Sequence, residues 1–268
     1  MATSAAPVVL IRLQSADVFD EDIKINMDKL AEIYNTEVVT EEERFVNLLK
    51  HQMPKVAVLA DNAVALPENG DLRGLLYGYI KAGGMVILAF QFAAMCNDND
   101  LDSTFKDLGL PMWTHASTSM SALTRTNLGR NPTMRAVFGE AAFDTMKESY
   151  EIEAVHIEGV EDREKFYVPL RFDWNVTKIN GRDSACTSAF TRVGAGYLGY
   201  VGDFPLQFGT VRVMKVMIGE LSLSADPFLR CLSANIWTDK ALGTPTSVHA
   251  PSAYTPGMSP SLRETCGP

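Results

Sequence analysis

Three short apolar runs rich in β-branched residues constrain the fold of this chain more than any other feature. They are Pro7–Leu13, Lys55–Ala60 and Met85–Phe90. Each run is short and bounded by turn residues, which is typical of a strand that is covered on both faces. Stretches with helical spacing separate the runs, as in Asp71–Ala82. Strands that alternate with helices predict βαβ units and a parallel sheet with right-handed crossovers.

The second half of the chain predicts antiparallel pairs. Ala154–Val160 and Lys165–Leu170 are expected to form a β-hairpin around a charged turn. Ala185–Val193 is expected to pair with Gly196–Val201 through a short turn that contains glycine. The segment 114–135 is polar and rich in Ser and Thr, and it predicts irregular structure. The fold class that follows is α/β, a mostly parallel doubly wound sheet with an added antiparallel hairpin region.

Length and composition predict one domain with an extension. Residues 1–223 fit the size of a single open α/β sheet. Residues 224–268 are expected to be a C-terminal extension, because their last part is rich in Pro, Ser, Thr and Gly and offers little for a core of its own. The net charge of −9 disfavours nucleic acid and anionic membranes as partners. A homodimer is left open.

The cysteine pattern favours a reducing compartment. The four cysteines are far apart and form no CxxC pair, which argues against a disulfide framework and a structural zinc site. No apolar run is long enough to span a bilayer, and no signal-peptide pattern is recognisable. We therefore expect a cytoplasmic protein. The sequence also contains no HExxH motif and no phosphate-binding loop, so we expect no metal and no cofactor.

Four phrases carry a resemblance to a known family: VAVLAD, YIKAGGMVILAFQF, LGLPMW and VGAGYLGYVGD. In them the chain resembles fungal proteins of unassigned function that look like class I glutamine amidotransferases and trehalose-utilisation-type proteins. The similarity extends over about residues 5–220. The resemblance implies a flavodoxin-like fold.

The resemblance does not extend to the chemistry of glutamine hydrolysis. In the glutaminase members, a Cys stands on a sharp turn after the strand that corresponds to Met85–Phe90, and a His follows the last core strand. Here Gln91 occupies that turn, and Asp203 stands near the position of the His. Cys96 comes several residues later. The resemblance therefore implies the fold without the glutaminase activity.

Residues that follow the predicted strands are the candidates for a site, because ligands bind outside the carboxyl ends of strands in open α/β sheets. We expect Gln91, His115 and Asp203 to act on the substrate, since an amide can orient a carbonyl and a His can transfer a proton. The substrate-binding candidates, which we expect to line the same cavity, are Asp61, Asn62, Phe90, Phe92, Trp113 and Thr114. Structural roles also fit some of them: Asp61 and Asn62 as helix caps, Trp113 as a core residue.

A cavity lined by aromatic side chains and a few polar groups suits an apolar small molecule. We therefore expect a cofactor-free enzyme of fungal secondary metabolite biosynthesis, which acts as a cyclase, an isomerase or a catalyst of a pericyclic reaction. Such an enzyme would hold a reactive conformer and polarise a carbonyl. Two alternatives stay open. One is a non-catalytic binding or scaffold protein on a degenerate amidotransferase-like fold, and the other is a hydrolase that uses Cys96 or Ser residues with His115.

Overall fold

A computed structural model describes residues 8–14, 36–127, 148–169, 185–203 and 212–218, together with single positions between 24 and 34 and at 146. All of them belong to the unit Met1–Ala225. The expected extension at residues 224–268 lies outside the described residues, so the division of the chain into a domain and an extension stays a prediction.

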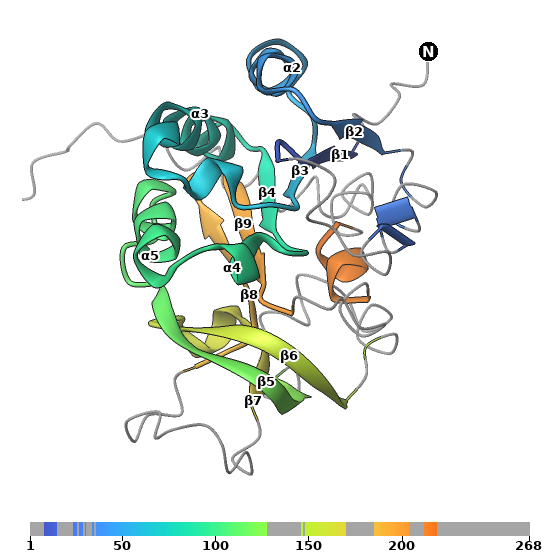
Figure 1. Cartoon of the computed structure of the whole chain (residues 1–268), viewed down its shortest axis with the longest axis vertical. Helices are drawn as coiled ribbons and strands as arrows, with labels where there is room; N and C mark the ends of the chain where they lie inside the picture. Colours follow the sequence, from blue (N-terminus) through green and yellow to red (C-terminus); the bar gives the residue numbers. More distant parts are fainter. Residues whose placement is uncertain are drawn as a thin grey trace, which may run out of the picture. The chain divides into compact units, whose positions relative to one another are not determined.

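The described strands form one sheet with a parallel and an antiparallel half (Figure 1). The parallel half contains β1 (Val8–Ile11), β2 (Glu37–Val39), β3 (Val56–Leu59), β4 (Met85–Leu88) and β9 (Gly196–Val201). The antiparallel half contains β5 (Thr114–Thr126), β6 (Ser149–Glu158), β7 (Lys165–Pro169) and β8 (Ser188–Val193). The nine strands follow the order β2-β1-β3-β4-β9-β8-β7-β5-β6. β9 pairs with β4 in parallel and with β8 antiparallel, so the two halves join at β9.

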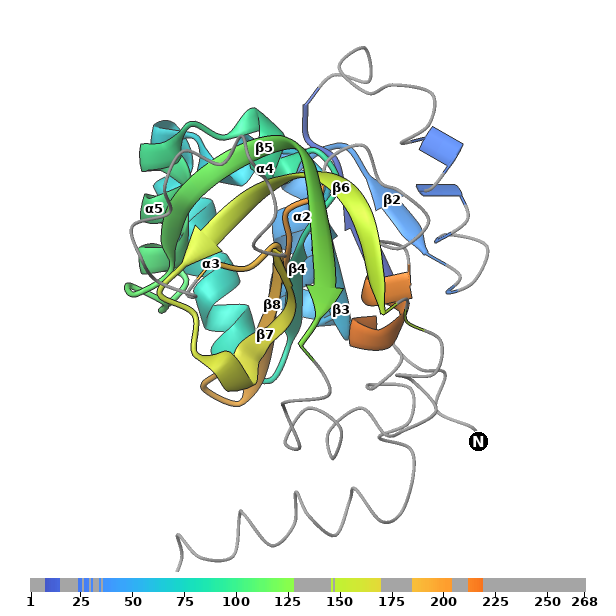
Figure 2. The ribbon, with the colours of Figure 1, turned by 90° about the horizontal axis from the view of Figure 1, so that it is seen from below.

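The expected fold class, a mostly parallel flavodoxin-like sheet, is wrong. Four neighbouring pairs of strands are parallel and four are antiparallel, so the sheet is mixed. The main error lies in segment 114–135, which contains the 13-residue strand β5 rather than irregular structure. β5 pairs with both β6 and β7, so those two strands do not form the expected hairpin. Figure 2 shows β5 and β6 side by side as a long curved ribbon.

The polar composition of β5 explains why its strand character is hard to recognise. Buried Ser and Thr side chains replace the apolar residues that normally mark the inner face of a strand. Thr124 is buried and donates a hydrogen bond to the carbonyl of Tyr150 on β6 (3.1 Å). Ser119 is buried as well, in a hydrogen bond to another β6 side chain. Because these hydroxyl groups have partners, β5 keeps polar residues inside without an alternating apolar pattern.

Helices follow the parallel strands β2, β3 and β4 along the chain. They are α2 (Glu42–Asn47), which continues as the π-helical turn η2 (Leu48–Gln52), then α3 (Gly70–Lys81), α4 (Phe92–Met95) and α5 (Asp98–Asp107). Short 3-10 turns are η3 (Ala63–Ala65), η4 (Pro67–Asn69) and η6 (Asp162–Glu164). α5 begins where the side chain of Asn97 accepts a hydrogen bond from the N–H of Asp100 (2.9 Å). Residues 212–218 are also helical.

The parallel strands are buried on both faces, which accounts for their continuous apolar runs. In β3, Val56 and Val58 pack into one core, and Ala57 and Leu59 pack into the other. The α3-side core includes Phe45, Leu76, Ile80, Leu101 and Phe105. The Met214-side core includes Met27, Leu30, Tyr150, Phe166 and Met214.

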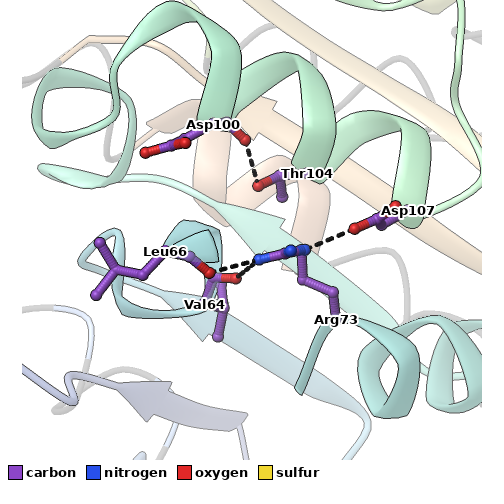
Figure 3. Close-up of polar contacts among 6 residues, drawn as sticks. All are labelled: Val64, Leu66, Arg73, Asp100, Thr104 and Asp107. Atoms are coloured by element: carbon purple, nitrogen blue, oxygen red, sulfur yellow. Dashed lines mark hydrogen bonds and ion pairs between the residues drawn. The ribbon is translucent and has the colours of Figure 1, made fainter. Parts of the chain in front are cut away.

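A buried arginine connects the helices on the α3 side (Figure 3). Arg73 lies on α3, and its Nη1 donates to the carbonyls of Val64 (2.9 Å) and Leu66 (2.8 Å). Its Nε donates to the carboxylate of Asp107 on α5 (2.7 Å). We call these four residues the Arg73 clamp. It fixes α3, the 3-10 turns after β3 and α5 relative to one another, and its buried cation has both an anionic partner and carbonyl acceptors.

Candidate functional site

The carboxyl ends of β3, β4 and β9 lie at one edge of the sheet, which we call the carboxyl edge. The three strands are neighbours and parallel, with Leu59 opposite Leu88 and Leu88 opposite Tyr200. Asp61 follows β3, Gln91 follows β4 and Asp203 follows β9, each within three residues of the strand end. The backbone therefore brings these three sequence candidates to the same edge, where open α/β sheets bind ligands.

Asp61 and Asn62 hold loops together at this edge. The carboxylate of Asp61 is buried and accepts hydrogen bonds from the backbone N–H of Gln14 (2.8 Å) and from that of Ala63 (3.0 Å). Asn62 accepts from the side-chain amide of Gln14 (2.8 Å) and donates to the carbonyl of Met95 (2.7 Å). Burial raises the pKa of Asp61, although the N–H donors act in the opposite direction. The polar atoms of both side chains are therefore engaged in structural contacts.

The turn after β4 has an uncommon backbone conformation. Phe90 has a φ of 60° although it is not glycine. A residue in this left-handed region is strained by about 1–3 kcal/mol, and such strain is most often found at functional sites. The turn leads directly into α4 and places Gln91 at its N-terminal cap position. The geometry of a sharp strand–turn–helix connection is thus present, with Gln91 as its polar side chain.

The aromatic candidates do not line one cavity. Phe90 packs in the Met214-side core, whereas Phe92 and Trp113 pack in the α3-side core. Trp113 lies edge-on to Phe105, with ring centroids 5.5 Å apart. All of them are almost completely buried. The structure therefore places these candidates on opposite faces of the sheet, as core residues.

Gln91 is partly exposed, yet its Oε1 atom is buried and accepts no hydrogen bond from any residue that the structure describes. Its backbone N–H donates to the carbonyl of Ala60 at 3.2 Å, which fixes the residue next to the end of β3. A buried acceptor without a donor costs about 1–3 kcal/mol. Among the sequence candidates, Gln91 is the one whose environment indicates a missing partner.

His115 and Thr114 lie at the start of β5 and are partly exposed. The N–H of His115 donates to Asp102 (2.6 Å), and its Nδ1 lies 3.3 Å from a carboxylate oxygen of Asp98. Its Nε2 lies 3.5 Å from the hydroxyl of Thr118. Within the described part of the chain, its polar contacts are therefore with α5 and β5, and the structure does not join it to Gln91 or Asp203.

Cys96 follows α4 as a partly buried free thiol. Burial raises the pKa of Cys96 to about 12, and the nearby carboxylates of Asp100 and Asp61 act in the same direction. At neutral pH the side chain is a thiol rather than the thiolate that nucleophilic catalysis requires. Among the described residues, no group of three or more His, Cys, Asp and Glu side chains is arranged to hold a metal ion.

Sequence reasoning missed a buried serine–histidine pair between β5 and β6. Ser119 Oγ and His156 Nε2 lie 2.7 Å apart, in a hydrogen bond whose direction depends on the tautomer of the imidazole. Ser119 is 8% exposed and His156 is 0% exposed. The sequence signal was a Ser at every second position, Ser117, Ser119 and Ser121, but it lay in a segment expected to be irregular.

Asp203 lies on the same face of the sheet as this pair. Ser119 is opposite Ala154 on β6, and Ala154 is also opposite Asp203 through an isolated antiparallel bridge. Opposite residues in antiparallel pairs share a face, and so do residues two apart along a strand, which adds His156. Ser119, His156 and Asp203 therefore surround the small side chain of Ala154.

Gln91 approaches this group through the backbone. Gln91 follows the last pair of the β4–β9 register, Leu88 opposite Tyr200, and α4, which begins after Gln91, lies against β6. We call Gln91, Ser119, His156 and Asp203 the edge cluster. Gln91 and Asp203 were candidates from the sequence, whereas Ser119 and His156 were not.

Comparison with known proteins gives little further guidance. No family model and no curated protein matches the sequence. Solved structures that align with it include the β-galactosidase from Rahnella sp. R3, at 12% identity and a TM-score of 0.49, over 81% of this chain and 31% of that chain. Another is the β-galactosidase from the haloarchaeon Halorubrum lacusprofundi, at 14% identity and a TM-score of 0.47, over 79% of this chain and 29% of that chain. An exo-β-1,4-mannosidase from Opitutaceae bacterium strain TAV5 aligns at 12% identity and a TM-score of 0.39, over 90% of this chain and 37% of that chain. The chain thus spans about a third of the length of these structures, and likeness at this level transfers no activity.

The expected relationship to fungal amidotransferase-like proteins is wrong. No family model matches this sequence, so none supports the relationship. The sheet is mixed rather than flavodoxin-like.

The functions built on that relationship are corrected with it. The cyclase, isomerase or pericyclic catalyst of secondary metabolism required one aromatic-lined cavity, but Phe90, Phe92 and Trp113 are core residues on two faces of the sheet. The scaffold on a degenerate amidotransferase-like fold loses its basis together with the family. The Cys–His hydrolase required a Cys96 thiolate, but burial raises the pKa of this thiol to about 12.

Proposed function

We propose that the protein binds a small molecule bearing hydroxyl or amino groups at the carboxyl edge of β3, β4 and β9. One observation carries the proposal: the buried Oε1 of Gln91 accepts no hydrogen bond among the described residues. A ligand donor at this atom would remove a desolvation penalty of about 1–3 kcal/mol. The carboxyl edge of parallel strands is also where open α/β sheets bind ligands.

The polarity of the edge argues for a donor-rich ligand rather than an apolar one. The aromatic side chains expected to contact an apolar substrate are packed within the two cores. At this edge the Oε1 atom of Gln91 is an acceptor that has no donor among the described residues. The net charge of −9 further favours neutral or cationic ligands over anions. A monosaccharide, a polyol or a small amine has the required donors.

Binding can be tested by calorimetry and thermal shift with monosaccharides, glycerol and ethanolamine. We expect at least one of these probes to stabilise the wild-type protein, and Gln91→Leu to weaken its binding about tenfold or more, because the leucine cannot accept the hydrogen bond. Gln52→Leu is the matched control, since Gln52 is exposed on η2. Equal binding by Gln91→Leu and wild type, or no binding of any probe, would contradict the proposal.

We further propose that the protein resides in the cytoplasm. Among the described residues, none of the helices is long and apolar enough to cross a bilayer, and Cys96 and Cys186 are free thiols. Free thiols persist in reducing compartments. Cell fractionation tests this placement, and recovery in an oxidising compartment would overturn it. The absence of a nucleic-acid partner and the possible homodimer stay predictions from sequence.

A further inference from the structure

The hydrogen bond between Ser119 and His156 has the geometry of a nucleophile and its general base. An oxygen-to-nitrogen distance of 2.7 Å lies within the range over which an imidazole takes the proton of an attacking hydroxyl. Ser119 retains slight exposure while His156 has none. Of the two residues Ser119 is the less buried, and His156 is shielded from water.

The surroundings of the pair differ from those of a purely structural hydrogen bond. Ser117 lies directly opposite His156, and its Oγ is buried without a hydrogen-bond partner among the described residues. Buried polar groups in a structural network are normally all paired. Ala154, which is opposite both Ser119 and Asp203, carries only a methyl group as its side chain.

From this geometry we propose that the protein hydrolyses esters of small acyl groups, with Ser119 as nucleophile and His156 as general base. The carboxylate of Asp203 shares their face and acts as a positioning residue that favours the imidazolium form of His156. This inference rests on the Ser119–His156 contact and does not depend on ligand binding at Gln91.

The reaction balances with water as the only co-reactant. Ser119 Oγ attacks the carbonyl carbon of the ester while His156 Nε2 takes the hydroxyl proton. The carbon–oxygen bond to the alcohol then breaks, and His156 returns the proton to the leaving alkoxide. In the second half, His156 deprotonates a water molecule, which attacks the acyl–Ser119 ester. The carboxylic acid leaves, and Ser119 regains its proton.

Covalent labelling of the full chain tests the proposal directly. A fluorophosphonate probe should modify one residue in the native protein, and peptide mapping should place it at Ser119. Ser119→Ala should abolish labelling and reduce hydrolysis of 4-nitrophenyl acetate by about a hundredfold or more. Ser103→Ala is the control, because this serine is exposed on α5. Absence of labelling, or labelling that persists in Ser119→Ala, would overturn the proposal.

Two further variants separate catalysis from folding. Ser119→Cys nearly keeps the size of the side chain, so this variant should melt close to wild type. With 4-nitrophenyl acetate it should accumulate a thioester, which mass spectrometry detects as an acetyl group on residue 119. A folded Ser119→Cys without this adduct contradicts the assignment. Asp203→Asn should lower kcat with little change in KM, and it should move the pH profile of the reaction toward lower pH, because the imidazolium form of His156 loses its stabilising carboxylate. An unchanged pH profile would remove the positioning role of Asp203.

Discussion

Arg73 and Ser119 are about equally buried, at 7% and 8% exposure, but their surroundings differ in one respect. In the Arg73 clamp, the guanidinium reaches two carbonyls and a carboxylate, all within 2.9 Å. In and beside the edge cluster, Gln91 Oε1 and Ser117 Oγ have no hydrogen-bond partner among the described residues. A buried polar group whose hydrogen bonds are all formed holds elements together. A buried polar group without a partner carries a desolvation penalty that a ligand can remove.

The largest effect is expected in the Arg73 clamp. Arg73→Met should lower the free energy of unfolding by about 2–4 kcal/mol, because it leaves the carbonyls of Val64 and Leu66 without this donor. Chemical denaturation measures this change. Asp107→Asn is the milder control, since its carboxylate is 43% exposed and the pair is partly solvated. A loss below about 1 kcal/mol in Arg73→Met would show that the clamp is not structural.

A smaller loss is expected for close backbone packing beside the edge cluster. A Cβ added at Gly202 would lie 2.1 Å from the carbonyl oxygen of Val155, so Gly202→Ala should destabilise the protein by about 2–3 kcal/mol. Gly74→Ala on α3 is a matched control because nothing lies within 4 Å of its added Cβ. That control should be stabilised by up to about 1 kcal/mol. Equal thermal unfolding of the two variants would refute the close approach.

Removing the unsaturated acceptor should change stability least, and any loss should be far smaller than that in Arg73→Met. Gln91→Leu eliminates a buried oxygen that has no donor among the described residues, so the free energy of unfolding should stay within about 1 kcal/mol of wild type or rise. The measurement is the same denaturation series. A loss above about 2 kcal/mol would mean that Gln91 is structural, like Arg73.

The thiol beside the carboxyl edge should remain unreactive. Because burial raises the pKa of Cys96 to about 12, its thiolate fraction at pH 8 is very small. Native Cys96 should react with iodoacetamide at least about a hundredfold more slowly than in the unfolded chain, as followed by peptide mass mapping. Rapid alkylation in the native state would contradict the prediction that burial keeps Cys96 as an unreactive thiol.

The sequence allowed prediction of the parallel half because those strands are buried on both faces. The runs around Val56–Leu59 and Met85–Leu88 must be apolar throughout, and such runs are visible without knowledge of their neighbours. The carboxyl-edge positions of Asp61 and Gln91 followed from the same logic of parallel strands. The strand before Asp203 was expected only in an antiparallel pair, and its parallel pairing with β4 was not predicted.

The antiparallel half was harder because its pairing is set by distant contacts. β5 stays polar on its inner face because Ser119 and Thr124 find partners on β6. The spacing of residues near Ser119 does not show that its partner is His156. The spacing near Asp203 does not show on which face of the sheet this residue lies. Sequence reasoning missed Ser119 and His156, because the role of each depends on a residue of the neighbouring strand.

The position of β9 has a consequence for the order in which the chain folds. Leu88 on β4 is paired with Tyr200 on β9, so this contact must close a loop that contains β5, β6, β7 and β8. Closing a loop of that length is slow, whereas the β8–β9 hairpin closes locally around Gly194 and Ala195. We expect the hairpin to form early and to dock onto β4 as a preformed unit. The docking step, rather than formation of either half, would then limit the folding rate, and the carboxyl edge would be completed last.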